Sequence, residues 1–170
     1  MIMLGVIVEG IDCAGKSTLI KNLKFNLKKL GGYDVRELEH IDTLNQFQRY
    51  LREYAYGERV LFDRSHISEV VFGKYLRSNK PFDSEQLTIL DLIVKNSYIL
   101  VVAIPSIEDF KKRMLETKNI QVLNNTDYDN VVSLFDLVTS KIPHMKYSSA
   151  NLEELNTLIN IIISKLRGSI

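Results

Sequence analysis

The stretch from residue 10 to residue 17 reads Gly-Ile-Asp-Cys-Ala-Gly-Lys-Ser, which is G-x-x-x-x-G-K-S. This spacing is the signature of a P-loop, a glycine-rich turn whose backbone amides cradle phosphates. An apolar, β-branched run over residues 3–8 precedes the turn and predicts a buried parallel strand. Residues 16–30 follow it with leucine and isoleucine at a helical period. A strand that turns into a helix in this way aims backbone N–H groups and a positive dipole end at an anion.

Individual residues of this loop have predictable roles. Gly10 and Gly15 permit the tight turn, because no Cβ blocks a positive φ or the close approach of a phosphate. Lys16 is expected to reach the β- and γ-phosphates of a nucleotide, and the Ser17 hydroxyl is expected to hold Mg²⁺. A carboxylate so close to phosphates is costly unless it faces a hydroxyl or a cation. Asp12 is therefore a candidate for contacting a sugar hydroxyl.

The composition is that of an ordinary globular domain. The chain has 170 residues, of which 45% are hydrophobic and 25% are charged. Its net charge of +1 provides no general attraction to nucleic acid or to anionic membranes, so neither is expected as a partner. The single cysteine cannot form an internal disulfide and suits a reducing compartment, so we expect a cytoplasmic location. No apolar run reaches transmembrane length.

Strand patterns and helix patterns alternate along the whole chain. Apolar or alternating runs predict further strands over residues 33–38, 59–62, 98–104 and 144–148. Helical periods predict helices over residues 44–56, 68–76, 84–96, 131–142 and 151–166, with another that opens at Pro105-Ser106. This alternation predicts an α/β fold of the P-loop NTPase kind, in which a five-stranded parallel sheet carries helices on both faces. Residues 1–170 are expected to form one domain, with the very apolar strand over 98–104 at its centre.

Ligands in such sheets bind beyond the carboxyl ends of the strands, so residues at those ends are candidates for chemistry. Asp63 closes an apolar strand and can hold Mg²⁺, and Arg64 beside it can offer a guanidinium to phosphate oxygens. Arg36 ends a strand that we expect beside the P-loop strand, and its bidentate guanidinium suits a phosphomonoester acceptor. Glu37 or Glu39 could instead act as a general base toward a hydroxyl acceptor.

Residues 113–128 are predicted to form a mobile lid, because they are polar and weakly patterned between two helices. Lys112, Arg113 and Lys118 lie near the start of this segment. Mobile lids commonly deliver a cation to the transferred phosphoryl group while they exclude water. Arg113 is accordingly predicted to be catalytic, and a plain flexible loop is the alternative.

Together, these residues resemble the thymidylate kinase family. Residues 9–18, Glu-Gly-Ile-Asp-Cys-Ala-Gly-Lys-Ser-Thr, are similar to that family's E-G-x-D-x-x-G-K-[ST]-T. Arg36-Glu37 matches the first two residues of its R-E-P motif. Asp63-Arg64-Ser65, with Ser68 and Phe72, resembles its D-R-Y-x-x-S…[YF] pattern. The likeness covers nearly the whole chain.

The resemblance implies a Mg²⁺-dependent kinase of nucleotide biosynthesis that transfers the γ-phosphoryl group of ATP to a deoxynucleoside monophosphate. It favours dTMP as the acceptor, dTDP as the product, and a homodimer as the assembly. The implied roles are ATP binding by Gly10, Ala14, Gly15, Lys16, Ser17 and Thr18; acceptor binding by Asp12, Arg36, Arg64 and Phe72; Mg²⁺ binding by Ser17 and Asp63; and catalysis by Lys16, Asp63, Arg64 and Arg113.

Two departures from the family pattern keep other functions open. Leu38 stands where R-E-P has its proline, and Ser65 stands where D-R-Y has its tyrosine, a variant closer to deoxynucleoside kinases. The first alternative is therefore a deoxynucleoside kinase in which Glu37 or Glu39 deprotonates a 5′-hydroxyl. The second is a nucleotide-binding module without turnover. A switch GTPase is disfavoured, because the chain has no evident N-K-x-D guanine motif.

Overall fold

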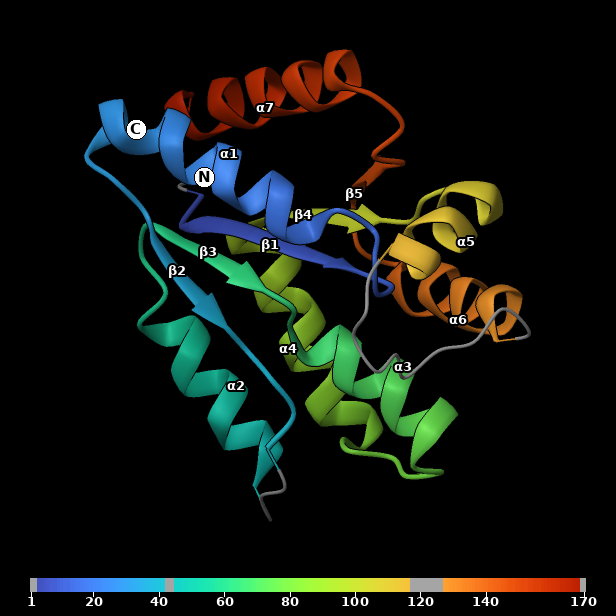
Figure 1. Cartoon of the computed structure of the whole chain (residues 1–170). Helices are drawn as coiled ribbons and strands as arrows, with labels where there is room; N and C mark the ends of the chain where they lie inside the picture. Colours follow the sequence, from blue (N-terminus) through green and yellow to red (C-terminus); the bar gives the residue numbers. More distant parts are fainter. Residues whose placement is uncertain (1–2, 42–44, 117–126, 169–170) are drawn as a thin grey trace.

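The computed structural model describes residues 3–41, 45–116 and 127–168. Within these residues, five parallel strands form one sheet in the order β2-β3-β1-β4-β5 (Figure 1). The strands are β1 (Gly5–Gly10), β2 (Asp34–Glu37), β3 (Val60–Asp63), β4 (Tyr98–Ala103) and β5 (His144–Tyr147). This confirms the predicted α/β fold. The expectation that the 98–104 strand is central is wrong, because β1 is the middle strand and β4 lies next to it.

The register of the strands brings their carboxyl ends to one edge of the sheet. Val8 of β1 lies opposite Asp63, and Asp63 lies opposite Glu37 of β2. On the other side, Ala103 of β4 lies between Gly10 and Tyr147. Every residue of β1 and β4 is buried, as expected for strands of a parallel sheet that is covered on both faces. Residues that follow the strands therefore share one rim of the molecule.

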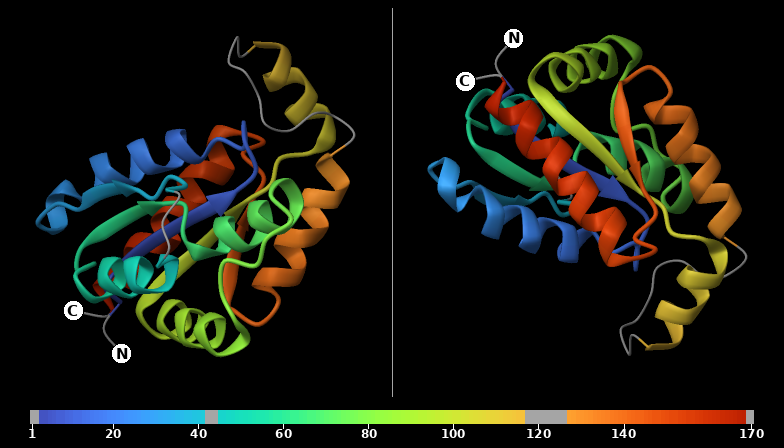
Figure 2. Two further views of the ribbon diagram at one scale, coloured as in Figure 1. Left: turned by 90° about the horizontal axis from the view of Figure 1, so that it is seen from below. Right: turned by 90° about the horizontal axis from the view of Figure 1, so that it is seen from above.

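Helices cover the two faces of the sheet unequally (Figures 1 and 2). One face carries α1 (Lys16–Leu27), the short 3₁₀ helix η1 (Lys28–Leu30) and α7 (Leu152–Arg167). The opposite face carries α2 (Gln46–Ala55), α3 (His66–Leu76), α4 (Ser84–Ser97) and α6 (Tyr128–Thr139). The remaining helix, α5 (Ile107–Glu116), lies beyond the carboxyl ends of β4 and β5. The helical period predicted for the segment after the P-loop is confirmed, since Leu19, Ile20, Leu23 and Leu27 are the buried apolar residues of α1.

Most of the predicted lid lies outside the described residues. Of residues 113–128, the structure describes 113–116, which form the last turn of α5, and 127–128, where α6 begins. Lys118 lies outside the described residues, and Arg113 lies within them. No helix in the described part of the chain combines the length and the apolar character needed to span a bilayer.

Candidate active site

The P-loop joins β1 to α1 through two glycines that no other residue could replace without strain. Gly10 has a φ of 133°, and a Cβ at this position would lie 2.0 Å from the carbonyl oxygen of Ala103 in β4. Gly15 has a φ of 80° and is the N-cap residue of α1. A Cβ on Gly15 would lie 3.1 Å from the Cβ of Ser149. The predicted tight turn is therefore observed, with the start of α1 facing the rim of the sheet.

Lys16 lies inside the corner that this turn forms. Its side chain is buried, and its Nζ donates a hydrogen bond to the carbonyl oxygen of Ile11 at 2.8 Å. Burial lowers the pKa of Lys16 from 10.5 to about 8, and the positive charge of Arg64 adds to this effect. Nearby carboxylates oppose the shift only in part. A phosphate bound here would give this ammonium group a negatively charged hydrogen-bond partner in place of a neutral carbonyl oxygen.

Arg64 and Asp12 connect the P-loop to the end of β3. Arg64 has a φ of 72°, and its backbone N–H donates to the carbonyl oxygen of Val8 at 3.0 Å. Its Nη2 donates to Oδ1 of Asp12 at 2.5 Å. The guanidinium carbon lies 5.2 Å from the ring centroid of Phe72, a cation–π arrangement. The structure thus brings together Asp12, Arg64 and Phe72, three of the residues predicted to bind the acceptor.

Ser17 and Asp63 are the residues predicted to hold Mg²⁺, and both carry oxygen atoms. Ser17 lies in the first turn of α1 with its side chain exposed. Asp63 ends β3, where burial raises the pKa of its carboxyl while the charges of Lys16 and Arg64 act in the opposite direction. A hydroxyl and a carboxylate are ligands that Mg²⁺ accepts together with substrate phosphates. The donor set therefore fits the ion that the motif implies.

Arg113 reaches the P-loop from the last turn of α5. Its Nη1 donates to the carbonyl oxygen of Cys13 at 3.1 Å and to the hydroxyl of Ser149. Its Nη2 donates to the carbonyl oxygen of Ser149 at 2.7 Å. The guanidinium therefore bridges the P-loop and the connection from β5 to α7. Although Arg113 is 100 residues from Cys13 in sequence, the structure places it beside the phosphate-binding loop.

A cavity of about 330 Å³ adjoins this corner on the β3 side. This size lies in the range of small-molecule sites. Four carboxylates and two guanidinium groups line the cavity. The lining residues are Asp12, Glu37, Leu38, Glu39, His40, Arg64, Ser68, Glu69, Phe72, Leu76 and Arg77.

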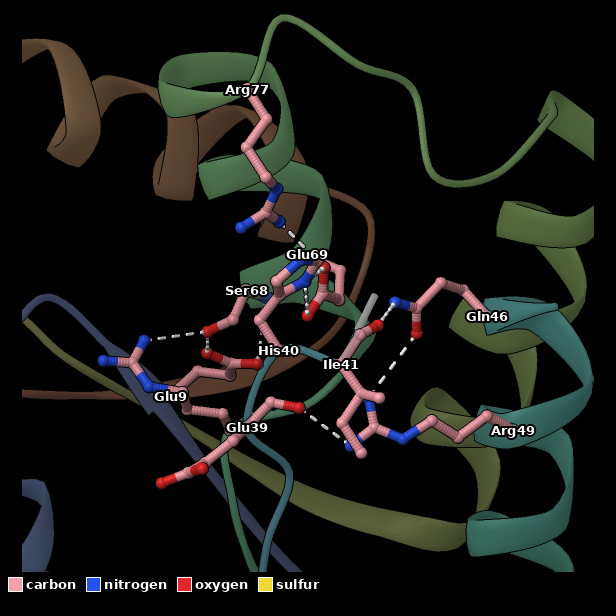
Figure 3. Close-up of polar contacts among 10 residues, drawn as sticks. Glu9, Glu39, His40, Ile41, Gln46, Arg49, Ser68, Glu69 and Arg77 are labelled. Atoms are coloured by element: carbon pink, nitrogen blue, oxygen red, sulfur yellow. Dashed lines mark hydrogen bonds and ion pairs between the residues drawn. The ribbon is translucent and has the colours of Figure 1, made fainter. Parts of the chain in front are cut away.

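A hydrogen-bonded cluster of His40, Glu69 and Arg77 forms part of the cavity wall (Figure 3). The carboxylate of Glu69 is almost fully buried, and its Oε2 accepts from Nη2 of Arg77 at 2.8 Å. The same oxygen lies 2.9 Å from Nδ1 of His40. The Nε atom of Arg77 is buried without a hydrogen-bond partner in the described part of the chain. This cluster holds the loop after β2 against α3.

Helix α2 fixes the same loop from its other side (Figure 3). Nη2 of Arg49 donates to the carbonyl oxygen of Glu39 at 2.8 Å. The side-chain amide of Gln46 donates to the carbonyl oxygen of Ile41. The backbone of this cavity wall is therefore held by side chains from two helices.

Arg36 does not join the other predicted site residues. The expectation that its strand lies beside the P-loop strand is wrong, because β3 lies between β2 and β1. The Arg36 guanidinium donates to Oε2 of Glu53 at 3.1 Å and to the carbonyl oxygen of Tyr56 at 3.2 Å. Successive side chains of a strand point to opposite faces, and here Glu37, rather than Arg36, lines the cavity.

Glu69 and Arg77 were not predicted from the sequence. Glu69 lies in the first turn of α3, and Arg77 follows the last residue of this helix, eight residues later. Neither residue belongs to a recognised motif. The sequence signal that could have indicated Glu69 is its position as an acidic residue beside Val70 and Val71 in an apolar helix. A buried carboxylate in such a place needs partners, but the sequence does not say which residues supply them.

Solved structures of other proteins share this fold. The YorR protein of Bacillus subtilis, solved in complex with phosphorylated GDP, matches with a TM-score of 0.79 and 20% identity over 96% of this chain and 95% of that chain. Deoxyadenosine kinase from M. mycoides, with bound dATP, matches with a TM-score of 0.58 and 17% identity over 96% of this chain and 99% of that chain. No protein-family model matches the sequence, and no curated protein matches it. The structural likeness shows that the chain has the fold of P-loop kinases.

Proposed function

We propose that this protein is a kinase that transfers the γ-phosphoryl group of ATP to an acceptor held in the cavity beside the P-loop. The observation that carries this proposal is the Asp12–Arg64 pair, which lines the cavity and also borders the phosphate-binding corner. Two neighbouring sites that share one guanidinium suit a reaction in which two substrates must be held in line. The nucleotide complexes of YorR and of deoxyadenosine kinase support the same interpretation.

The P-loop side of the site would hold ATP. Lys16 would bind the β- and γ-phosphates, and the backbone from Gly10 to Thr18 would surround them. Ser17 and Asp63 would hold Mg²⁺, which would neutralise charge on the phosphates. Arg113 already lies against this loop and would offer its guanidinium to the transferred group.

A nucleoside hydroxyl is the acceptor that the cavity supports best. An acceptor phosphate needs cations, whereas the carboxylates of this cavity outnumber its guanidinium groups by four to two. Arg77 is bonded to Glu69, and Arg36 is bonded to Glu53 outside the cavity. A hydroxyl acceptor instead needs a base within reach, and Glu37 provides a carboxylate at the end of β2. We therefore favour a deoxynucleoside as the acceptor.

Phosphorylation of dTMP to dTDP is the second candidate. The observation that favours it is the position of Arg64, which lies over Phe72 at the edge of the cavity. Its pair with Asp12 is partly exposed to solvent, so an acceptor phosphate could compete for the guanidinium. In this case Asp12 would turn to a sugar hydroxyl, as the family resemblance implies.

A coupled assay with ATP, Mg²⁺ and a panel of deoxynucleosides and their monophosphates tests both candidates. ADP release with deoxynucleosides supports the hydroxyl acceptor, and release with dTMP alone supports the second candidate. In the first case, Glu37→Gln should lower kcat by about 10²- to 10⁴-fold and leave the KM for ATP unchanged. Glu39→Gln is the matched control, since Glu39 lines the same cavity. ATP binding without ADP release on any acceptor would show a binding module and contradict the kinase proposal.

We also propose that the protein forms a homodimer, as the family resemblance implies. Ile89 and Leu92 on α4 are 44% and 49% exposed and offer an apolar surface for such an interface. Light scattering coupled to size-exclusion chromatography tests this proposal. A monomeric mass at micromolar concentration would contradict it.

A further inference from the structure

A buried carboxylate at the end of β1 has no part in the function proposed so far. Glu9 is fully buried, and both of its oxygen atoms accept hydrogen bonds from the start of α3. Its Oε1 accepts from Oγ of Ser65 at 2.5 Å and from the backbone N–H of Ser68 at 3.2 Å. Its Oε2 accepts from Oγ of Ser68 at 2.5 Å. Burial of a carboxylate is costly, and the three hydrogen bonds that Glu9 accepts compensate for its lost hydration.

The direction of each hydrogen bond in this cluster follows from its chemistry. A carboxylate only accepts, and a serine hydroxyl has one proton to give. Ser68 therefore gives its proton to Glu9 (Figure 3). It presents a lone pair to Nη1 of Arg64, which lies 3.2 Å away. Ser65 likewise gives its proton to Glu9 and accepts from the backbone N–H of Ile67 at 3.2 Å. Ser68 thus connects Glu9 to Arg64 by hydrogen bonds, and Ser65 connects Glu9 to the N-terminus of α3.

We propose that Glu9 is a positioning residue that holds the Arg64 guanidinium at the phosphate corner by keeping Ser68 as a hydrogen-bond acceptor. This inference rests on the proposed function, in which Arg64 is the guanidinium shared by the phosphate corner and the acceptor cavity. Nη2 of Arg64 is bonded to Asp12, and Nη1 is bonded to Ser68. When a phosphate draws Nη2 away from Asp12, the bond from Nη1 to Ser68 keeps the guanidinium in place. The group then turns about a fixed point and loses little orientation.

A purely structural role for Glu9 gives a different expectation. Glu9 also accepts from two groups that stabilise the N-terminus of α3, and a negative charge is favourable there. If that were its whole contribution, loss of either serine hydroxyl would affect activity only as far as it affects folding. The two serines therefore separate the two roles, because both contact Glu9 and only Ser68 contacts Arg64.

The kinetic test compares Ser68→Ala and Glu9→Gln with Ser65→Ala as the matched control. In Glu9→Gln, the side-chain amide would donate a hydrogen bond to Oγ of Ser68, which already accepts one from Nη1 of Arg64. The hydroxyl proton of Ser68 would then no longer point to residue 9 and would turn toward Arg64. We expect Ser68→Ala and Glu9→Gln to lower kcat by about 10- to 100-fold, the loss expected for a hydrogen bond to a charged group. The KM for ATP should stay within about twofold, and the double variant should be no slower than the worse single variant. Ser65→Ala should lose thermal stability through its helix cap and keep its kcat.

A second measurement does not depend on any substrate. Nitrogen-15 spectra of the arginine side chains report rotation of the Nη1 group of Arg64, assigned with the variant Arg64→Lys. Rotation should be slow in the wild type and in Ser65→Ala, and fast in Ser68→Ala and Glu9→Gln. Slow rotation in Ser68→Ala, or an equal loss of kcat in Ser65→Ala, would overturn the proposal. If no acceptor is phosphorylated, the proposed function fails, and the spectra still decide whether Glu9 holds Arg64.

Discussion

Replacement of Lys16 by methionine is expected to stabilise the unliganded protein while it abolishes ATP binding. The folded protein lowers the pKa of this lysine from 10.5 to about 8. A shift of this size corresponds to a penalty of about 3 kcal/mol for holding the charged form at neutral pH. The variant also loses the hydrogen bond from Nζ to the carbonyl oxygen of Ile11, which contributes about 1 kcal/mol. The free energy of unfolding at pH 7 should therefore rise by about 2 kcal/mol.

The pH dependence of this effect identifies its cause. At pH 7 the lysine is protonated in both the folded and the unfolded chain, so the full penalty is present. Between about pH 8 and pH 10.5 the unfolded chain keeps a proton that the folded chain has released. The free energy of unfolding of the wild type should therefore rise with pH across this window relative to that of Lys16→Met. The two curves should approach each other as the penalty disappears.

Urea unfolding at pH 7 and pH 10 measures this difference, with Lys21→Met as a control. Lys21 is an exposed lysine of the same helix, so its loss should change stability little at either pH. Parallel wild-type and Lys16→Met curves from pH 7 to pH 10 would refute the reasoning. So would a variant that is less stable than the wild type at pH 7, because the lysine would then stabilise the corner.

Three further outcomes follow from the same geometry. Above about pH 8 the affinity for ATP, measured by calorimetry, should fall as Lys16 loses its proton in the free protein; constant affinity up to pH 10 would argue against its role in phosphate binding. Arg36→Ala should leave the KM for the acceptor within about twofold of the wild-type value in steady-state kinetics. It should lower the free energy of unfolding in urea by less than about 1 kcal/mol, because the pair of Arg36 with Glu53 is partly exposed. A large rise in the KM for the acceptor would show that Arg36 does contact the acceptor. Gly10→Ala should lower stability by more than about 3 kcal/mol in thermal unfolding, because its Cβ would overlap the carbonyl oxygen of Ala103; a wild-type melting temperature would contradict the loop geometry described above.

The fold was predictable because its signals are local. Each strand of the sheet is a short apolar or alternating run, and each helix shows its period in the sequence. The P-loop adds Gly10 and Gly15, which both have positive φ values in the structure. These features depend on near neighbours in the chain, so the order of strands and helices follows directly from the sequence.

The position of Arg36 was not predictable on the same terms. Its role depended on which strand lies beside β1, and that order is set by how the crossovers pack. The strand over 33–38 was expected beside β1, but β3 occupies that place, which moves β2 to the edge of the sheet. Arg36 then faces α2 and donates a hydrogen bond to Glu53 of that helix, while Glu37 lines the cavity. The sequence indicated both residues as candidates, and the alternation of side chains along β2, together with the strand order, separated them.

The buried acidic residues show a second limit of sequence reasoning. Glu9 and Glu69 are both almost fully buried, whereas Glu39 is exposed, and the sequence does not say which donors each buried carboxylate contacts. Their burial depends on donors brought from other elements, such as Ser68 for Glu9 and Arg77 for Glu69. Such long-range pairs have no fixed spacing, so only the folded structure reveals them.

The contacts within this corner explain how the proposed phosphate site can be stable before phosphate binds. Each of the three cations assigned to the phosphates donates to an acceptor of the protein: Lys16 to a loop carbonyl, Arg64 to Asp12, and Arg113 to the carbonyl of Cys13. A carbonyl oxygen carries only a partial charge, so a phosphate oxygen is the stronger partner for Lys16 and Arg113. Asp12 is a full charge, and Arg64 leaves it at a greater cost. ATP should therefore engage Lys16 and Arg113 first, and Arg64 should follow only when an acceptor in the cavity provides Asp12 with another partner.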